Sequence, residues 1–255
     1  LNNGAINLPA GGSLTVNNGF LLEAAVGGSG VHFRSLGSYC HVVNFTSDVT
    51  YLHGVFQAST GVSFSGNVVN EGTMRNRGIT SYSAVVQGDL ENNGEIINPV
   101  YSFTLTVLGD ITNNGIWSNT LTLLDGTTDQ FVYLVNSQPI TGEVRFDANF
   151  SGAGFVWYGP GGSLVGNPSF SGATSQTLRF LVPVTDAFAG QYYCRNNQAV
   201  NSRNIFIQAL SNPVRPLTLN FLLEGLYNAG GQMNPSLDGS GNPVWNSSVT
   251  DQISV

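Results

Sequence analysis

The chain has 255 residues, a formal net charge of −7 and only 9% charged residues, and all eight of its basic residues are arginines. The absence of lysine excludes enzymes that need a P-loop or Schiff-base lysine, and so few basic residues argue against a nucleic-acid partner. No apolar run reaches the ~18 residues of a membrane span, whereas a hydrophobic content of 41% can build packed cores. The chain starts at Leu1 without an initiator methionine or a signal peptide, so we expect a mature protein or an excised piece.

A repeat dominates the first half of the chain. Three segments align without gaps: GNVVNEGTM at 66–74, GDLENNGEI at 88–96 and GDITNNGIW at 109–117. A step of 22 and then 21 residues between short β-type stretches is typical of a β-solenoid, whose stacked coils bury a face that one coil cannot bury alone. The alternative, an antiparallel sheet of Asn-Gly hairpins, would place adjacent strands only ~2–5 residues apart. We predict that residues 1–128 form a right-handed parallel β-helix.

The asparagine and the glycine of each copy are expected to form a corner of the coil, because both residue types tolerate positive φ. Stacked asparagine side chains can also hydrogen-bond from coil to coil, as in Asn ladders. Structural roles are therefore assigned to Asn70, Asn92, Asn113, Gly72, Gly94 and Gly115.

Residues 22–60 fit the repeat poorly and contain a cysteine and three histidines: His32, Cys40, His41 and His53. This grouping raises the possibility of a metal site. Alternation along a strand would send Cys40 and His41 to opposite faces, however, so packed or surface histidines are the preferred explanation.

The solenoid also carries acidic residues that a glycosidase would require in pairs. The candidates are Glu71, Asp89, Glu91, Glu95 and Asp110. Asp89 and Asp110 share one repeat position and would stack ~4.8 Å apart, but a residue dictated by repeat register is more simply a turn former. Aromatic candidates for stacking on sugars are Tyr51, Tyr82, Tyr101 and Trp117. We assign no catalytic residue, no metal site and no cofactor.

The Asn-Gly repeat ends near residue 128, and alternating strands follow. FVWY at 155–158 and AGQYYC at 189–194 resemble strands of an immunoglobulin-type sandwich. This resemblance makes Trp157 the core tryptophan and Tyr192 the tyrosine corner, in a domain spanning residues 129–211. No cysteine lies between Val144 and Phe150 to pair with Cys194, and we expect Phe146 or Ala148 at that position. Cys194 is then a buried free thiol, the alternative being a bridge to Cys40.

The last segment, 212–255, is rich in turns. FLLEGLYNAGGQMNPSL at 221–237 resembles a β-module found near the C-terminal ends of secreted Bacteroidetes-type proteins, through Glu224, Gly225, Tyr227, Gly231, Met233 and Leu237. This resemblance implies an all-β protein of tandem β-helix, immunoglobulin-like and terminal modules, exported by the type IX secretion route. No sorting domain is visible, so the module is expected to be incomplete.

These observations together predict an extracellular, cell-surface structural or adhesion protein without catalytic activity. The expected partners are a protein or a glycan at the cell surface, with a further contact to the secretion machinery; no nucleic-acid partner and no membrane span are expected. The alternative is a carbohydrate-active β-helix enzyme or a carbohydrate-binding protein, with a cleft between Glu71 and Asp110.

Overall fold

The computed structural model describes residues 4–17, 20–98, 100–211 and 240. The chain divides into two units, Leu1–Asn212 and Pro213–Val255. The expected C-terminal module therefore lies almost entirely outside the described residues. The first unit is built from β-strands, with one three-residue 3-10 helix, η1 (Asp186–Phe188), among its described residues.

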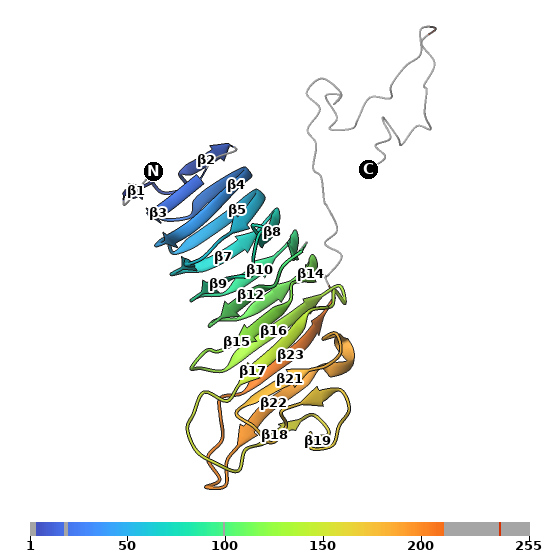
Figure 1. The fold of residues 1–255 in the computed structure, drawn as a ribbon. Helices are drawn as coiled ribbons and strands as arrows, with labels where there is room; N and C mark the ends of the chain where they lie inside the picture. The colour runs from blue at the N-terminus through green and yellow to red at the C-terminus, as the bar shows by residue number, and fades with distance from the viewer. Residues whose placement is uncertain (1–3, 18–19, 99, 212–239, 241–255) are drawn as a thin grey trace, which may run out of the picture. The chain divides into compact units, whose positions relative to one another are not determined.

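Most strands stack in parallel along three faces of a β-solenoid, named sheets I, II and III (Figure 1). Sheet I contains β1 (Ala5–Asn7), the ends of β3 (Phe20–Gly27) and β4 (Val31–Phe45), β6 (Val62–Phe64), β9 (Tyr82–Val86), β12 (Phe103–Val107), β15 (Leu121–Leu124) and β17 (Glu143–Asp147). Sheet II contains β2 (Ser13–Asn17), the starts of β4 and β5 (Val49–Ala58), β7 (Asn67–Asn70), β10 (Leu90–Asn92), β13 (Ile111–Asn113), β16 (Gln130–Val135) and β23 (Ile205–Leu210). Sheet III contains parts of β3, β4 and β5, then β8 (Thr73–Asn76), β11 (Glu95–Ile97) and β14 (Ile116–Ser118).

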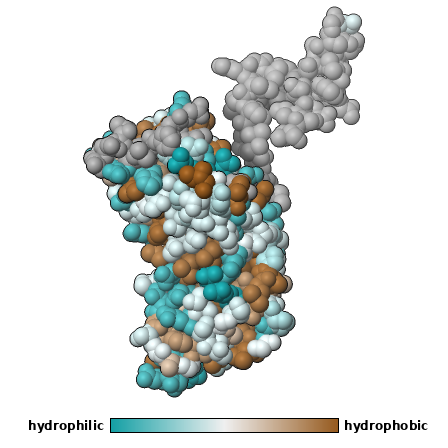
Figure 2. Space-filling model, in the orientation of Figure 1, coloured by the Kyte–Doolittle hydropathy of each residue, from teal (hydrophilic) through white to brown (hydrophobic). Residues whose placement is uncertain are grey.

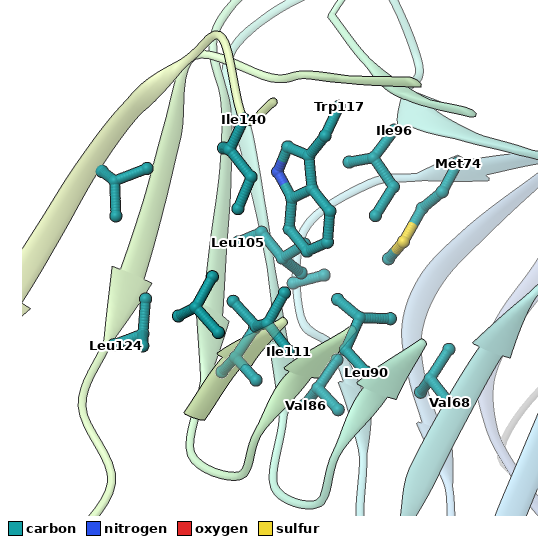
Figure 3. Packing of buried hydrophobic residues seen from close by; sticks show 14 of the residues in the cluster. Val68, Met74, Val86, Leu90, Ile96, Leu105, Ile111, Trp117, Leu124 and Ile140 are labelled. Atoms are coloured by element: carbon teal, nitrogen blue, oxygen red, sulfur yellow. The ribbon is translucent and has the colours of Figure 1, made fainter. Parts of the chain in front are cut away.

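The core is a set of apolar rows that run from coil to coil. Each repeat places one aliphatic residue at the same inward position of sheet II, so Val68, Leu90 and Ile111 pair in register and are buried (Figure 3). Met74, Ile96 and Trp117 form the equivalent row in sheet III. Burial of such rows supplies the driving force that one coil lacks.

Residues 22–60 also belong to the solenoid, although they lack the repeat signature. Val31 pairs with Thr50, and Phe45 with Phe64. The core is aromatic here: the ring centroids of Phe45 and Phe64 are 4.7 Å apart in a stacked geometry. Large rings therefore fill the volume that aliphatic residues fill in the later coils.

Antiparallel strands close the far end of the solenoid. In sheet II, β23 is followed by β22 (Gly190–Arg195), β18 (Val156–Gly159) and β19 (Gly162–Ser163). In sheet I, β17 is followed by β21 (Thr177–Phe180) and β20 (Phe170–Ser171). Residues 129–211 thus continue two sheets of the solenoid and lie within the same compact unit. Figure 1 shows β1 and β2 at one end of this unit and β18 and β19 at the other.

Candidate functional site

The outward side of sheet II carries most of the polar and aromatic candidates. Strand alternation sends every second residue to solvent, and parallel pairing in register aligns these residues into rows along the solenoid. One row reads His32, Tyr51, Val69, Glu91, Thr112 and Tyr133 from β4 to β16. In the view of Figure 2, apolar surface occurs as separate patches among pale and hydrophilic residues.

The stacked position shared by Asn67, Asp89 and Asp110 forms a ladder of side chain to backbone contacts. Asn67 Oδ1 accepts the Asp89 N–H at 2.9 Å, and Asp89 Oδ1 accepts the Asp110 N–H at 2.9 Å. Asp110 Oδ1 then accepts the Phe131 N–H at 2.8 Å. Each side chain thus holds the backbone of the following coil, which favours the turn-former explanation over a catalytic pair.

Asp110 nevertheless has a perturbed carboxyl group. Burial raises its pKa, the neighbouring Asp89 raises it further, and the Phe131 N–H opposes both effects. A raised pKa is one property of a general acid, and it is the observation that favours the enzymatic alternative.

The structure does not bring all five acidic candidates together. Glu71 and Glu91 share an outward neighbour in sheet II, because Asn93 Nδ2 lies 2.8 Å from Glu91 Oε1 and 3.4 Å from Glu71 Oε1. Glu95 belongs to sheet III, where it accepts a hydrogen bond from Thr73 Oγ1 at 3.3 Å. The carboxylates thus divide between two faces of the solenoid.

The repeated asparagines form a buried ladder between sheets II and III. Asn70 Nδ2 donates to Asn92 Oδ1 at 2.8 Å, and Asn92 Nδ2 donates to Asn113 Oδ1 at 2.9 Å. Asn113 Nδ2 reaches the Gln138 and Pro139 carbonyl oxygens, each at 3.2 Å. All three asparagines are fully buried. The ladder begins at Asn70 because Leu52 occupies the same position in the preceding coil.

The glycines of the repeat have a different role from the one expected. Gly72, Gly94 and Gly115 do not have positive φ, so the left-handed corner predicted for them is wrong. A Cβ on Gly94 would instead lie 2.1 Å from the carbonyl oxygen of Gly72, and one on Gly115 2.1 Å from that of Gly94. Glycine is required because the backbones of successive coils approach closely here.

The histidines of the first coils pair with each other and with a hydroxyl group. His32 Nδ1 lies 3.0 Å from His53 Nε2, and the Tyr51 ring stacks on His32 with centroids 4.6 Å apart. His41 contacts Ser59 Oγ at 3.0 Å, while Cys40 is buried, so the two residues do face opposite ways. In the described part of the chain, no group of three or more His, Cys, Asp or Glu side chains is placed to hold a metal ion.

The predicted aromatic candidates are scattered. Trp117 is buried, with Nε1 donating to Asn119 Oδ1 at 2.8 Å and to Thr122 Oγ1 at 3.0 Å. Tyr82 lines a shallow hollow of about 360 Å³ with Thr60, Ser81, Ser83 and Thr104. Tyr101 is exposed, and Tyr51 is half-buried.

Sequence reasoning missed two groups of stacked rings on neighbouring strands of sheet II: Phe131, Tyr133 and Phe206 form one group, and Tyr158 and Tyr193 form the other. The signal was present in QFVYLV at 130–135, where alternation already places Phe131 and Tyr133 on one face. Their neighbours could not be identified, because β23 and β22 join this sheet from distant parts of the sequence.

The residues of the sandwich motif gather at the closed end. Trp157 pairs with Cys194 across β18 and β22, and Trp157 Nε1 donates to the Ser175 carbonyl at 2.9 Å. The Tyr192 hydroxyl donates to the Phe188 carbonyl at 2.8 Å. Phe146 and Ala148 are both buried. Cys40 and Cys194 are free and buried, which confirms the buried free thiol predicted for Cys194, and burial raises the pKa of that thiol to about 11.

Comparison with known proteins gives no relative: no family model, no curated protein and no solved structure matches this chain. Among the described residues, no helix has the length and apolar character needed to cross a membrane.

Proposed function

We propose that this chain is a non-catalytic structural and adhesive protein of the cell exterior, a right-handed β-helix that displays its outer rows to a partner. The observation that carries the proposal is the ladder through Asn67, Asp89 and Asp110. The carboxylates best placed for catalysis hold the backbone of the next coil, so the acidic repeat position is explained by the fold itself.

The proposal includes an immunoglobulin-like arrangement of residues 129–211. The Trp157–Cys194 strand pair and the Tyr192 hydroxyl bond to a carbonyl four residues upstream support it, since both are hallmarks of that sandwich. Aromatic rings pack in this region, with the Phe146 and Tyr192 centroids 5.7 Å apart. Export by the type IX route, and the terminal module at 212–255, rest on the sequence resemblance alone.

The experiment compares binding with turnover. The chain is incubated with neutral and acidic polysaccharides and with surface-coated host and bacterial glycoproteins, and both bound protein and released reducing ends or unsaturated sugars are measured. Binding without release supports the proposal. Release of sugars by the wild-type chain contradicts it.

Asp89→Asn and Asp110→Asn provide the matched test, because Asn67 already fills the same position in another coil and keeps the accepting Oδ1 atom. Both variants should fold and bind like the wild type. A carbohydrate-active enzyme, the alternative function, would instead lose its turnover while remaining folded.

A further inference from the structure

A strip of five half-buried aromatic rings crosses the outward side of sheet II near its closed end. Phe131 and Tyr133 lie on β16, Phe206 on β23, Tyr193 on β22 and Tyr158 on β18. These strands are consecutive neighbours in the sheet. At a strand spacing of ~4.8 Å, the strip extends roughly 14 Å along the solenoid.

The rings of the strip form two groups, and within each group neighbouring rings stack with nearly parallel planes. The Phe131 and Phe206 centroids are 4.9 Å apart with planes 15° apart, and Phe131 and Tyr133 are separated by 5.7 Å with planes 4° apart. Tyr158 and Tyr193 stack at 5.1 Å and 12°. Because each ring is packed against a neighbour, little side-chain entropy is left to lose when a ligand binds.

Hydrogen-bonding groups border the rings. Gln191 pairs with Phe206 across the strands, and its Nε2 donates to Asn204 Oδ1 at 2.7 Å. Asn204 Nδ2 lies 3.2 Å and 3.1 Å from the two carboxylate oxygens of Asp129. Gln208 is exposed beside Tyr133. This border is fixed by its own hydrogen bonds and still presents acceptor lone pairs and amide protons to solvent.

The charge around the strip selects against an anionic ligand. Asp110 accepts the Phe131 N–H at the end of the ladder, and the charges of Asp110 and Asp89 add to burial in raising the pKa of the Tyr133 hydroxyl. Arg195 is exposed two residues beyond Tyr193 on the same face of β22, so one positive charge borders the tyrosine pair, whereas the Phe131 and Tyr133 end of the strip adjoins carboxylates. The chain as a whole carries a net charge of −7.

We propose that this aromatic strip is a binding surface for a neutral polysaccharide, which lies along the solenoid axis with its C–H faces against the rings and its hydroxyls on the amide and carboxylate border. A protein partner fits less well, because the cores of protein interfaces are depleted of charge, whereas here carboxylates adjoin the rings. The inference rests on the proposed adhesive function and names the class of its partner.

Affinity gel electrophoresis tests the proposal with three soluble neutral polysaccharides, xyloglucan, mixed-linkage β-glucan and galactomannan, and with polygalacturonate as the anionic comparison. The wild-type chain should be retarded by at least one neutral polymer and not by polygalacturonate. Phe206→Ala and Tyr193→Ala should each weaken that binding about tenfold or more.

Three controls separate ring contact from fold stability. Leu181→Ala removes an exposed apolar side chain outside the strip and should leave binding unchanged. Phe206→Tyr keeps the ring and should also bind. Thermal unfolding of each variant shows whether lost binding reflects lost structure, and only variants with the wild-type midpoint are compared.

The proposal is overturned if no neutral polymer binds, if polygalacturonate binds equally well, or if both ring deletions bind like the wild type. If the chain binds coated glycoproteins but no polysaccharide, the proposal that the strip binds a neutral polysaccharide is refuted, and the proposed adhesive function still stands. Sugar release by the wild type would refute the non-catalytic function. The binding role of the strip is then tested by measuring polysaccharide binding of Phe206→Ala and Tyr193→Ala in chains that also carry Asp110→Asn.

Discussion

The buried asparagine ladder makes a sharp prediction about stability. Replacing Asn92 with alanine removes the middle member of the ladder and leaves the coils on either side without their shared amide. The adjacent Asn93 is the matched control, since it has the same residue type one position along the chain but points to solvent.

The magnitude follows from the contacts that are lost. Asn92 accepts from Asn70 at 2.8 Å and donates to Asn113 at 2.9 Å and to the Ile116 carbonyl at 3.0 Å. Asn70 keeps other acceptors, and Asn113 Oδ1 keeps the Gly115 N–H at 3.3 Å. At about 1 kcal/mol per buried hydrogen bond, and more for a partner left unsatisfied, Asn92→Ala should lower the free energy of unfolding by about 2–4 kcal/mol.

Urea denaturation of both variants measures the difference. Asn93→Ala loses only solvent-exposed contacts, to Glu91, Glu71 and Asn114, and should change the free energy of unfolding by less than about 0.5 kcal/mol. The slope against urea should stay constant if the solenoid still unfolds as one unit. Equal midpoints for Asn92→Ala and Asn93→Ala would refute the argument that the ladder stabilises the stacked coils.

Three further predictions concern other features of the solenoid. Gly94→Ala places a Cβ 2.1 Å from a backbone oxygen and should lower the free energy of unfolding in urea by about 3 kcal/mol or more. Gly161→Ala, whose Cβ would have nothing within 4 Å, should leave the free energy of unfolding unchanged. Similar losses in the two variants would contradict the explanation by close backbone approach. Burial and the nearby charges of His32 and Arg34 lower the pKa of His53 below 6.5 in the folded state, so the stability present above pH 6.5 should fall as the pH drops through the folded-state pKa. His53→Gln should make this decline shallower, and an unchanged pH profile would show that His53 does not cause it. Cys40 and Cys194 should react with a thiol reagent only after unfolding, giving two thiols per chain, and rapid labelling of the folded chain would show that one is accessible.

The repeat was predictable because each copy must place an aliphatic residue in the core and an asparagine in the buried ladder at the same positions. Aligning Val68 with Leu90 and Ile111 by sequence alone gives the strand register found in sheet II, and it also aligns the asparagines of the ladder. The predicted solenoid included the earlier coils, but their register could not be derived from a repeat, because their constraint is volume in the core, which Phe33, Phe45, Phe56 and Phe64 satisfy without a fixed turn sequence.

The candidate site was less predictable, since it depends on which strands become neighbours. The acidic ladder follows from the repeat register, so stacking of Asp89 with Asp110 could be anticipated. The aromatic strip could not be anticipated, because Phe131 meets Phe206 only through the parallel pairing of β16 with β23. Most of the closing segment lies between these two strands in the sequence. No local pattern encodes that pairing.

The joint between the coils and the closing strands gives this distant pairing its physical basis. Arg203 lies just before β23, and its guanidinium donates to Gln130 Oε1 at 2.8 Å and to the Leu124 carbonyl at 2.9 Å. Gln130 Nε2 in turn donates to the Val107 carbonyl at 3.2 Å, one coil earlier. The outer edge of β16 would be open to pairing with another chain unless a further strand covered it in register. This polar network holds β23 against β16 and so covers that edge. Because the aromatic strip is assembled from β16 and the strands that follow it in the sheet, the contacts that close the solenoid also place the rings side by side.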